Sequence, residues 1–299
     1  VALDRLIEFG NEDIKKYIKG VLRENKWSIL PLSIFPTAPG QGAIAIEAKK
    51  DNKQLKGIIK KINSYDTFKN VQKEKLTLSK YGGGCHQKIG TSVWDENGIK
   101  LISLVGMSHD LKPLKNFGLD KPYDKTAKLN KNNRLYPMQN EEKIFNRKAI
   151  DNSKKIKNIK DSLIYISRKN VLDKVEYIDS SNILWTSGIN CWKNAVSRGY
   201  WIHGTSDSFG ERRSINVENF LSKNLPRYKL SHDKSSSDNY KLIPVYELTV
   251  KKNIKKNMNL NDKTHFFWMS PFQFDLALDL FPDIINGNHS CGFGRTYNH

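Results

Sequence analysis

The sequence predicts a fold that combines the α/β and α+β classes in more than one domain. Its 299 residues suffice for two domains of ordinary size. Apolar residues recur at helical spacing over residues 1–23, and the stretch 89–105 has the pattern of a β-hairpin. From Ser162 onward, short apolar runs alternate with helical segments, which is typical of an α/β domain.

The first third of the chain is predicted to hold helices and a small antiparallel sheet. Helices are expected over residues 55–62 and 71–80, and the apolar run 43–46, which follows a turn, is expected to be a buried strand. Strands are expected over residues 89–94 and 100–105, because the Asn-Gly pair between them is a strong hairpin signal.

The middle of the chain, residues 111–161, is predicted to be a connector. It is rich in Lys and Asn, has few sustained apolar faces, and carries prolines at positions 113, 122 and 137. One helix is expected within it, near residues 141–150. His109 and Asp110, just before the connector, are expected to be surface residues.

The remaining residues, 162–299, are predicted to form an α/β region. Strands are expected over residues 163–167, 183–188 and 266–271, and a helix over residues 272–281. The last two strands end in small polar residues and lead into helices, an arrangement that presents backbone N–H groups and the helix dipole to a carboxylate. The alternative is that Ser187 and Ser270 serve only as helix N-caps.

A glycine-rich loop ends in a cysteine at residues 82–85. Three glycines leave the backbone free to adopt positive φ and to turn its N–H groups toward one point. Such a setting lowers the pKa of the Cys85 thiol and favours the nucleophilic thiolate. The alternative is a tight loop with an incidental thiol.

A second glycine-containing loop, Pro39-Gly40-Gln41-Gly42, lies 44 residues before that cysteine, counted from Gln41 (85 − 41). Gly40 and Gly42 would let backbone amides approach a ligand closely, and the Gln41 side chain offers both a donor and an acceptor. The alternative is a turn that only precedes a strand.

Together the two loops resemble those of hydroxymethylbilane synthase (porphobilinogen deaminase). In that family a PxxGQGAxxxE stretch precedes a GGC loop whose cysteine carries the dipyrromethane cofactor. The resemblance covers residues 1–110; Glu74-Lys75 stands where the family has Glu-Arg, and Gly82 replaces a usual Glu. It implies that Cys85 holds dipyrromethane covalently, and that the cofactor site is lined by Gln41, Gly42, Gly83 and Gly84.

The same resemblance implies a domain division and a substrate. Residues 1–48 would be a remnant of the family's periplasmic-binding-like α/β domains, and residues 49–110 its small α+β domain. The substrate would be porphobilinogen, and the catalytic carboxylate would lie upstream of Val1. Because the first residue is not Met, we interpret the chain as a fragment.

Residues 162–299 look like uroporphyrinogen-III synthase, joined to the first part by a linker at 111–161. The similar elements are Trp185–Gly188, Trp268–Pro271, the segment 199–204 with Phe209-Gly210-Glu211, and the segment 291–296. This resemblance implies a fused enzyme that cyclises hydroxymethylbilane, truncated after His299. It implies carboxylate binding by four residues: Thr186, Ser187, Ser270 and Thr296.

The net charge of +19 indicates an anionic partner. No basic run carries the interleaved aromatic residues that bind single-stranded nucleic acid, whereas a pyrrole bearing carboxylates fits a positive field. Two alternatives stay open: an inactive scaffold that binds a tetrapyrrole or another enzyme of the pathway, and a basic nucleic-acid-binding protein.

The spacing of the cysteines and the hydropathy of the chain give no reason to expect a disulfide, a metal ion or a membrane partner. Cys85, Cys191 and Cys291 are far apart, and none has zinc-ligand spacing with another Cys or a His, so we expect neither a disulfide nor a metal. A reducing cytoplasmic location is expected. No apolar run approaches the roughly 20 residues of a membrane span, so no membrane partner is expected.

Overall fold

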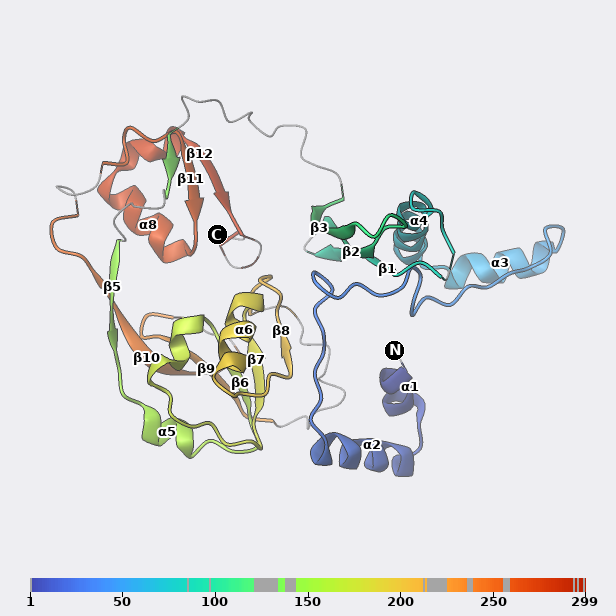
Figure 1. Cartoon of the computed structure of the whole chain (residues 1–299), viewed down its shortest axis with the longest axis horizontal. Helices are drawn as coiled ribbons and strands as arrows, with labels where there is room; N and C mark the ends of the chain where they lie inside the picture. The colour runs from blue at the N-terminus through green and yellow to red at the C-terminus, as the bar shows by residue number, and fades with distance from the viewer. Residues whose placement is uncertain are drawn as a thin grey trace. The chain divides into compact units, whose positions relative to one another are not determined.

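The computed structural model contains two compact units, each with its own helices and sheets (Figure 1). It describes residues 2–84, 86–96, 98–120, 134–137, 144–211, 213, 225–235, 239–254, 259–292, 294, 296–297 and 299. The first unit comprises Leu30–Thr126, and the second comprises Ala2–Ile29 together with Ala127–His299. The mixed α/β character predicted from the sequence is present in the described residues.

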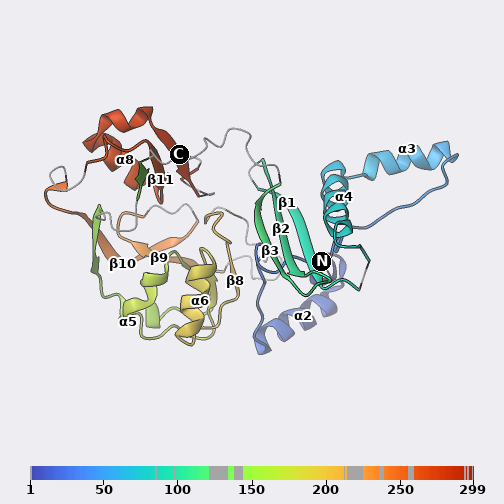
Figure 2. The ribbon, with the colours of Figure 1, turned by 45° about the horizontal axis from the view of Figure 1, so that its top comes forward.

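The first unit is a three-stranded antiparallel sheet with two helices before it. The helices are α3 (Lys53–Ile62) and α4 (Tyr65–Ser79), and the sheet has the order β1 (Ile89–Glu96), β2 (Ile99–Met107), β3 (Pro113–Leu119). Strands β1 and β2 form the hairpin predicted from the sequence, and α4 packs against β1 (Figure 2). The two predicted helices are confirmed, although α4 begins six residues earlier than expected.

The core of this unit is small because its apolar residues come from few elements. Ile89 and Val93 of β1 and Leu101 and Leu104 of β2 are buried. On the helical side, α4 buries polar residues, and α3 buries none at all. Polar contacts therefore carry much of the cohesion between α4 and the sheet.

Three expectations for residues 43–161 are wrong. The segment 43–46 forms no strand: Ile44 is 75% exposed and Ile46 is 54% exposed, because no described strand pairs with the segment to satisfy its backbone groups. The expected connector contains strand β3, and in place of a helix near 141–150 it contains strand β5 (Phe145–Ala149), paired antiparallel with a strand that lies a hundred residues later.

The second unit begins with two helices, α1 (Ala2–Phe9) and α2 (Glu12–Glu24), as the apolar spacing predicts. Its main sheet has six strands, parallel except for β5. In spatial order they are β5, β10 (Lys241–Val250), β9 (Arg227–His232), β6 (Leu163–Ile166), β7 (Ile183–Thr186) and β8 (Gly204–Thr205).

Strand β6 stands at the topological switch point of this sheet. From β6 the chain proceeds outward through β7 to β8, then returns to the other side of β6 as β9 and β10. Helices α5 (Ser153–Lys157) and α6 (Ile189–Ser197) and the 3-10 helix η1 (Lys169–Lys174) belong to the same region, and α6 packs against η1 and β7.

The β6 sequence Leu-Ile-Tyr-Ile is apolar throughout because both of its faces are covered. Ile164 and Ile166 belong to one buried cluster, whereas Leu163 and Tyr165 belong to another with Trp185. A strand in the middle of a parallel sheet shows this continuous apolar pattern.

A second, smaller parallel sheet completes the chain. Its order is β12 (Asn288–Cys291), β11 (His265–Trp268), β4 (Leu135–Tyr136), and helix α8 (Pro271–Leu280) follows β11 as predicted. The 3-10 helix η2 (Pro282–Asn286) comes next. None of the helices in the described part of the chain combines the length and apolar character needed to cross a bilayer.

Candidate functional site

Three consecutive residues of the glycine-rich loop have positive φ: Gly82 at 96°, Gly83 at 67° and Gly84 at 93°. The loop starts where α4 ends, with the Gly82 N–H donating to the Ser79 carbonyl at 3.1 Å. The prediction that these glycines supply left-handed backbone is confirmed, since other residues adopt such φ values at a cost. Cys85 itself lies outside the described residues.

The backbone is also crowded just before the cysteine. A Cβ atom added to Gly84 would lie 2.8 Å from Cε1 of the His86 ring, and one added to Gly90, at the start of β1, would lie 2.4 Å from the Pro36 carbonyl oxygen. Only the contact at Gly90 is a close approach of two backbone segments, and it joins the start of β1 to the segment that precedes Gly40.

The Pro-Gly-Gln-Gly loop is built from successive turns. Gly40 and Gly42 have φ values of 74° and 89°, the Gln41 N–H donates to the Ala38 carbonyl at 3.1 Å, and the Ala43 N–H donates to the Gly40 carbonyl at 3.1 Å. Gln41 and Gly42 are exposed. The structure thus shows a turn here, with the Gln41 side chain on the surface, where a ligand can reach it.

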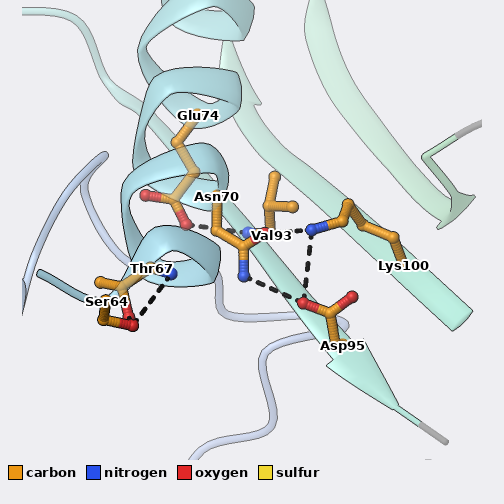
Figure 3. A network of polar contacts seen from close by, with 7 residues as sticks. All are labelled: Ser64, Thr67, Asn70, Glu74, Val93, Asp95 and Lys100. Carbon is orange, nitrogen blue, oxygen red and sulfur yellow. Dashed lines mark hydrogen bonds and ion pairs between the residues drawn. The ribbon is translucent and has the colours of Figure 1, made fainter. Parts of the chain in front are cut away.

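A buried carboxylate joins this loop to the sheet. Glu74 of α4, only 8% exposed, accepts a hydrogen bond from the Gly40 N–H at 2.7 Å and another from the Val93 N–H at 2.8 Å. Figure 3 shows the bond between Glu74 and Val93. Each carboxylate oxygen thus has its own backbone donor. Hydrogen bonds to an ionised acceptor are about twice as strong as neutral ones, so this arrangement fixes the loop on the α4–β1 pair.

The segment before Gly40 runs alongside β1 and adds to this attachment. The Thr37 N–H donates to Ser92 Oγ at 2.9 Å, and the Thr91 N–H donates to the Thr37 carbonyl at 2.9 Å. Both loops singled out by the sequence are therefore attached to one helix–strand pair. The glycine-rich loop connects α4 to β1, the Pro-Gly-Gln-Gly loop is hydrogen-bonded to α4 through Glu74, and Thr37, just before that loop, is hydrogen-bonded to β1.

A second polar network fixes the other end of α4. The Lys100 ammonium lies 2.5 Å from Asn70 Oδ1 and 3.3 Å from Asp95 Oδ2, and the Asn70 amide donates to the same Asp95 oxygen at 3.3 Å (Figure 3). Ser64 caps the helix by accepting a hydrogen bond from the Thr67 N–H at 3.4 Å. This network holds the helix against β1 and β2.

The four candidate carboxylate-binding residues of the second unit lie at the end of β7 (Thr186 and Ser187), at the start of α8 (Ser270) and after β12 (Thr296). Thr186 is fully buried at the end of β7, and the Ser187 hydroxyl donates to the Ser167 carbonyl at 2.7 Å. Ser270 is the N-cap of α8 and accepts from the Gln273 N–H at 3.3 Å, as the capping alternative predicts. Thr296 is partly exposed near the end of the chain.

Sequence reasoning missed a set of serines at the switch point. The Ser167 hydroxyl, just after β6, lies 2.8 Å from the Leu230 carbonyl and 3.0 Å from the Ser231 hydroxyl at the end of β9. With Ser187 after β7, each of three neighbouring parallel strands has a serine next to its carboxyl end. The signal was present as a serine after each apolar run, but the sequence does not show which runs are adjacent.

The two described cysteines are poor nucleophiles. Burial raises the pKa of the Cys191 thiol to about 11, and burial also raises the pKa of Cys291. Both are free thiols. Within the described ranges, no group of three or more His, Cys, Asp or Glu side chains is placed to hold a metal ion.

Comparison with known proteins links part of the chain to one group of enzymes. The chain is 38% identical over 84 residues to the probable porphobilinogen deaminase of Methanocaldococcus jannaschii. This match covers 27% of this chain and 28% of that protein. It is 52% identical over 62 residues to the porphobilinogen deaminase of Caldicellulosiruptor saccharolyticus, 21% of each chain. It is 41% identical over 70 residues to that of Oceanobacillus iheyensis, 23% of each chain.

These matches are partial. The chain spans about a quarter of the length of the curated relatives that it matches. No protein-family model matches the chain, and no solved structure matches it. Over about a quarter of its length, the chain is homologous to porphobilinogen deaminases at 35–52% identity.

Proposed function

We propose that the first unit is the cofactor-bearing part of a hydroxymethylbilane synthase (porphobilinogen deaminase) and that Cys85 is the attachment point of dipyrromethane. The function is then a step of tetrapyrrole biosynthesis. The observation that carries the proposal is the Glu74 carboxylate, which attaches the Gly40 loop to the same helix–strand pair that the Gly82–Gly84 loop connects.

The chemistry of attachment requires a thiolate and an electrophilic carbon. The Cys85 sulfur would attack the exocyclic methylene carbon of an azafulvene, forming a C–S bond. The electron pair displaced from the C=C bond returns to the pyrrole nitrogen, which takes up a proton. Left-handed glycines turn backbone N–H groups toward one point, a setting that favours the thiolate.

In that role the first unit presents the primer, and Gln41, Gly42, Gly83 and Gly84 line its site. Porphobilinogen units then add to the bound dipyrromethane with loss of ammonia. The carboxylate that stabilises the developing positive charge, and the arginines that bind the acid side chains, are assigned to no residue of this chain.

A chimera tests this proposal, because a relative supplies the parts of a deaminase that this chain does not match. The segment of the Caldicellulosiruptor enzyme that this chain matches is replaced by the equivalent residues of this chain, with Cys85 or with Cys85→Ser. We expect the Cys85 chimera to consume porphobilinogen and the Cys85→Ser chimera to be inactive. A folded Cys85 chimera with no activity would refute the proposal.

We also propose that residues 162–299 form a uroporphyrinogen-III synthase-like region. The observation in its favour is the switch point of the six-stranded sheet at β6, because open α/β sheets bind ligands outside the carboxyl ends of the strands at such a point. No covalent nucleophile is needed for ring closure, so positioning would supply most of the rate.

The test of the second activity is the isomer formed from hydroxymethylbilane. The full chain should produce the type III isomer, whereas spontaneous closure gives type I. Type I alone from the folded chain would contradict this activity and favour a scaffold that binds a tetrapyrrole or another enzyme of the pathway.

A further inference from the structure

The second unit contains a cavity that neither proposed activity uses. Its volume is about 1360 Å³, and its lining comes from α1, α2, the segment 25–27 and the residues just before or at the start of four strands. Those strands are β9, β6, β7 and β8, which are neighbours in the six-stranded sheet. The cavity therefore lies at the amino ends of the parallel strands, whereas the switch point lies at their carboxyl ends.

The segment that follows α2 forms one wall of the cavity and is hydrogen-bonded to the residues before β8. The Trp201 Nε1–H donates to the Trp27 carbonyl at 2.9 Å, and the Ile29 N–H donates to the His203 carbonyl at 2.8 Å. These bonds fix Trp27 and Trp201 beside each other in the lining.

Trp27, Trp201 and His203 form an aromatic corner of the cavity. The rings of Trp27 and His203 meet edge to face, with centroids 4.8 Å apart. The side chain of Trp201 is 44% exposed. Because its N–H is already bonded to the Trp27 carbonyl, the exposed part is aromatic ring surface that forms no hydrogen bond with water. An aromatic ring of a ligand would cover this surface favourably.

Two hydrogen-bond donors lie at the aromatic corner. The Lys26 ammonium is 5.5 Å from the centroid of the Trp201 ring. His203 Nδ1 accepts the Leu184 N–H at 3.1 Å, so the proton of the neutral ring is on Nε2. Burial lowers the pKa of His203 to about 4, which keeps the ring neutral near pH 7. Among the described residues, neither the Lys26 ammonium nor His203 Nε2 has an acceptor.

The other charged groups of the lining do not neutralise these donors. They are two cations and three carboxylates: Lys19, Arg23, Glu8, Glu24 and Asp161. In the part of the chain that the structure describes, no ion pair joins any of the three carboxylates to Lys26. With Lys26 the two signs balance, so the two donors at the aromatic corner, and not the overall charge of the lining, select the ligand.

We propose that this cavity binds a small aromatic carboxylate, with its ring on Trp27 and Trp201 and its carboxylate held by the Lys26 ammonium and the His203 Nε2–H. A ring without a carboxylate would leave both donors without an acceptor, and an aliphatic acid would leave the indole surface exposed. Neither Cys85 nor the β6 switch point takes part, so both proposed activities can fail without affecting this site.

Calorimetric titration of the full chain with indole-3-propionate, at constant ionic strength, tests the class of ligand. Three related compounds each lack one feature: indole has no charge, tryptamine has an ammonium in place of the carboxylate, and cyclohexanepropionate has no aromatic ring. We expect indole-3-propionate to bind about tenfold more tightly than each of them, the difference that one charge-assisted hydrogen bond or one aromatic contact supplies.

Two lysine variants test the position of the site. Lys26→Gln should weaken the binding of indole-3-propionate about tenfold and leave the binding of indole unchanged. Lys16→Gln is the matched control, because Lys16 is an exposed lysine of α2 outside the lining, and its loss should leave both affinities unchanged. Both side chains are exposed, so both variants should fold.

The tryptophan N–H signals give a second readout by NMR. The ring of bound indole-3-propionate should shift the signals of Trp27 and Trp201 and leave that of Trp94, on β1 of the first unit, unchanged.

Equal affinity for cyclohexanepropionate and indole-3-propionate would overturn the proposal, because it would mean that net charge alone attracts the anion. Equal affinities of Lys26→Gln and Lys16→Gln for indole-3-propionate, or a shift of the Trp94 signal without one of Trp201, would overturn it as well.

Discussion

Glu74 and Gly40 are 34 residues apart in sequence, and the Glu74 carboxylate accepts the Gly40 N–H at 2.7 Å. Its other oxygen accepts the Val93 N–H at 2.8 Å. One side chain thus ties the Pro-Gly-Gln-Gly loop to the strand that follows the glycine-rich loop. The geometry makes Glu74 a positioning residue for the Pro-Gly-Gln-Gly loop against β1.

Replacing Glu74 should release the loop. Glu74→Ala leaves two N–H groups without their acceptor and should destabilise the first unit by about 3 kcal/mol. Glu74→Gln keeps one acceptor oxygen and should show a smaller loss. The measurement is amide hydrogen exchange at Gly40 and Val93, which should lose protection together. Unchanged protection at both amides in a folded Glu74→Ala variant would contradict this role.

Alanine at Gly84 should be strained, because φ is 93° there and the new Cβ would meet the His86 ring. We expect a loss of about 1–2 kcal/mol in stability. Gly57 of α3 is the matched control: a Cβ there meets nothing within 4 Å, so Gly57→Ala should be neutral or stabilising by up to about 1 kcal/mol. Thermal denaturation compares the two, and equal effects would argue against a strained loop.

The three thiols should differ in alkylation rate. Because burial raises the pKa of Cys191 to about 11 and also raises that of Cys291, both stay protonated at pH 7. Cys85 should be alkylated first by iodoacetamide, as followed by peptide mapping, and Cys191 should become reactive only as pH rises toward 11. Faster labelling of Cys191 than of Cys85 at pH 7 would count against an activated Cys85.

Acid should destabilise the second unit. Burial lowers the pKa of His203 and of His232 to about 4, below the usual value of 6.5. Both rings are neutral in the folded state, so their contribution is fully present above pH 6.5 and is lost as pH falls toward 4. Between pH 7 and 5 we expect a loss of about 2 kcal/mol for each. Urea unfolding at several pH values measures this loss of unfolding free energy. His203→Gln should make the unfolding free energy less dependent on pH, whereas His109→Gln, at an exposed site, should not.

The net charge of +19 should not make this a nucleic-acid-binding protein. Duplex DNA should bind weakly at physiological salt, with an affinity that falls steeply as salt rises, as counterion release requires. Tight binding at physiological salt in a filter or fluorescence assay would favour the nucleic-acid alternative over a carboxylate-bearing ligand.

Local patterns predicted the local elements. The hairpin at 89–107, helices α3 and α4, and the β11–α8 pair follow from alternation, apolar spacing and turn residues, all of which act over a few positions. The elements that were predicted wrongly depend on pairing with strands that lie far away in the sequence. The apolar run containing Ile44 and Ile46 is a strand only where another strand pairs with it, and β5 exists because β10 does.

The candidate site was predictable in its backbone and not in its contacts. Three glycines before a cysteine indicate left-handed backbone, which Gly82, Gly83 and Gly84 show. That Glu74 would be buried beside Gly40 could not be inferred, because a Glu in a helix is most often exposed. Ser167 and Ser231 come together only through strand order, which the sequence does not reveal.

The central claim is that Cys85 carries dipyrromethane, and peptide mapping by mass spectrometry tests it most directly. The chimeric deaminase described above is incubated with hydroxymethylbilane and analysed as intact protein and as peptides. We predict a mass increment of two pyrrole units on the peptide that contains Cys85, and we expect Cys85→Ser to abolish it. In a second chimera, extended to hold the whole of this chain, Cys191→Ser and Cys291→Ser should both keep the increment. A folded chimera whose Cys85 peptide is unmodified would contradict the claim.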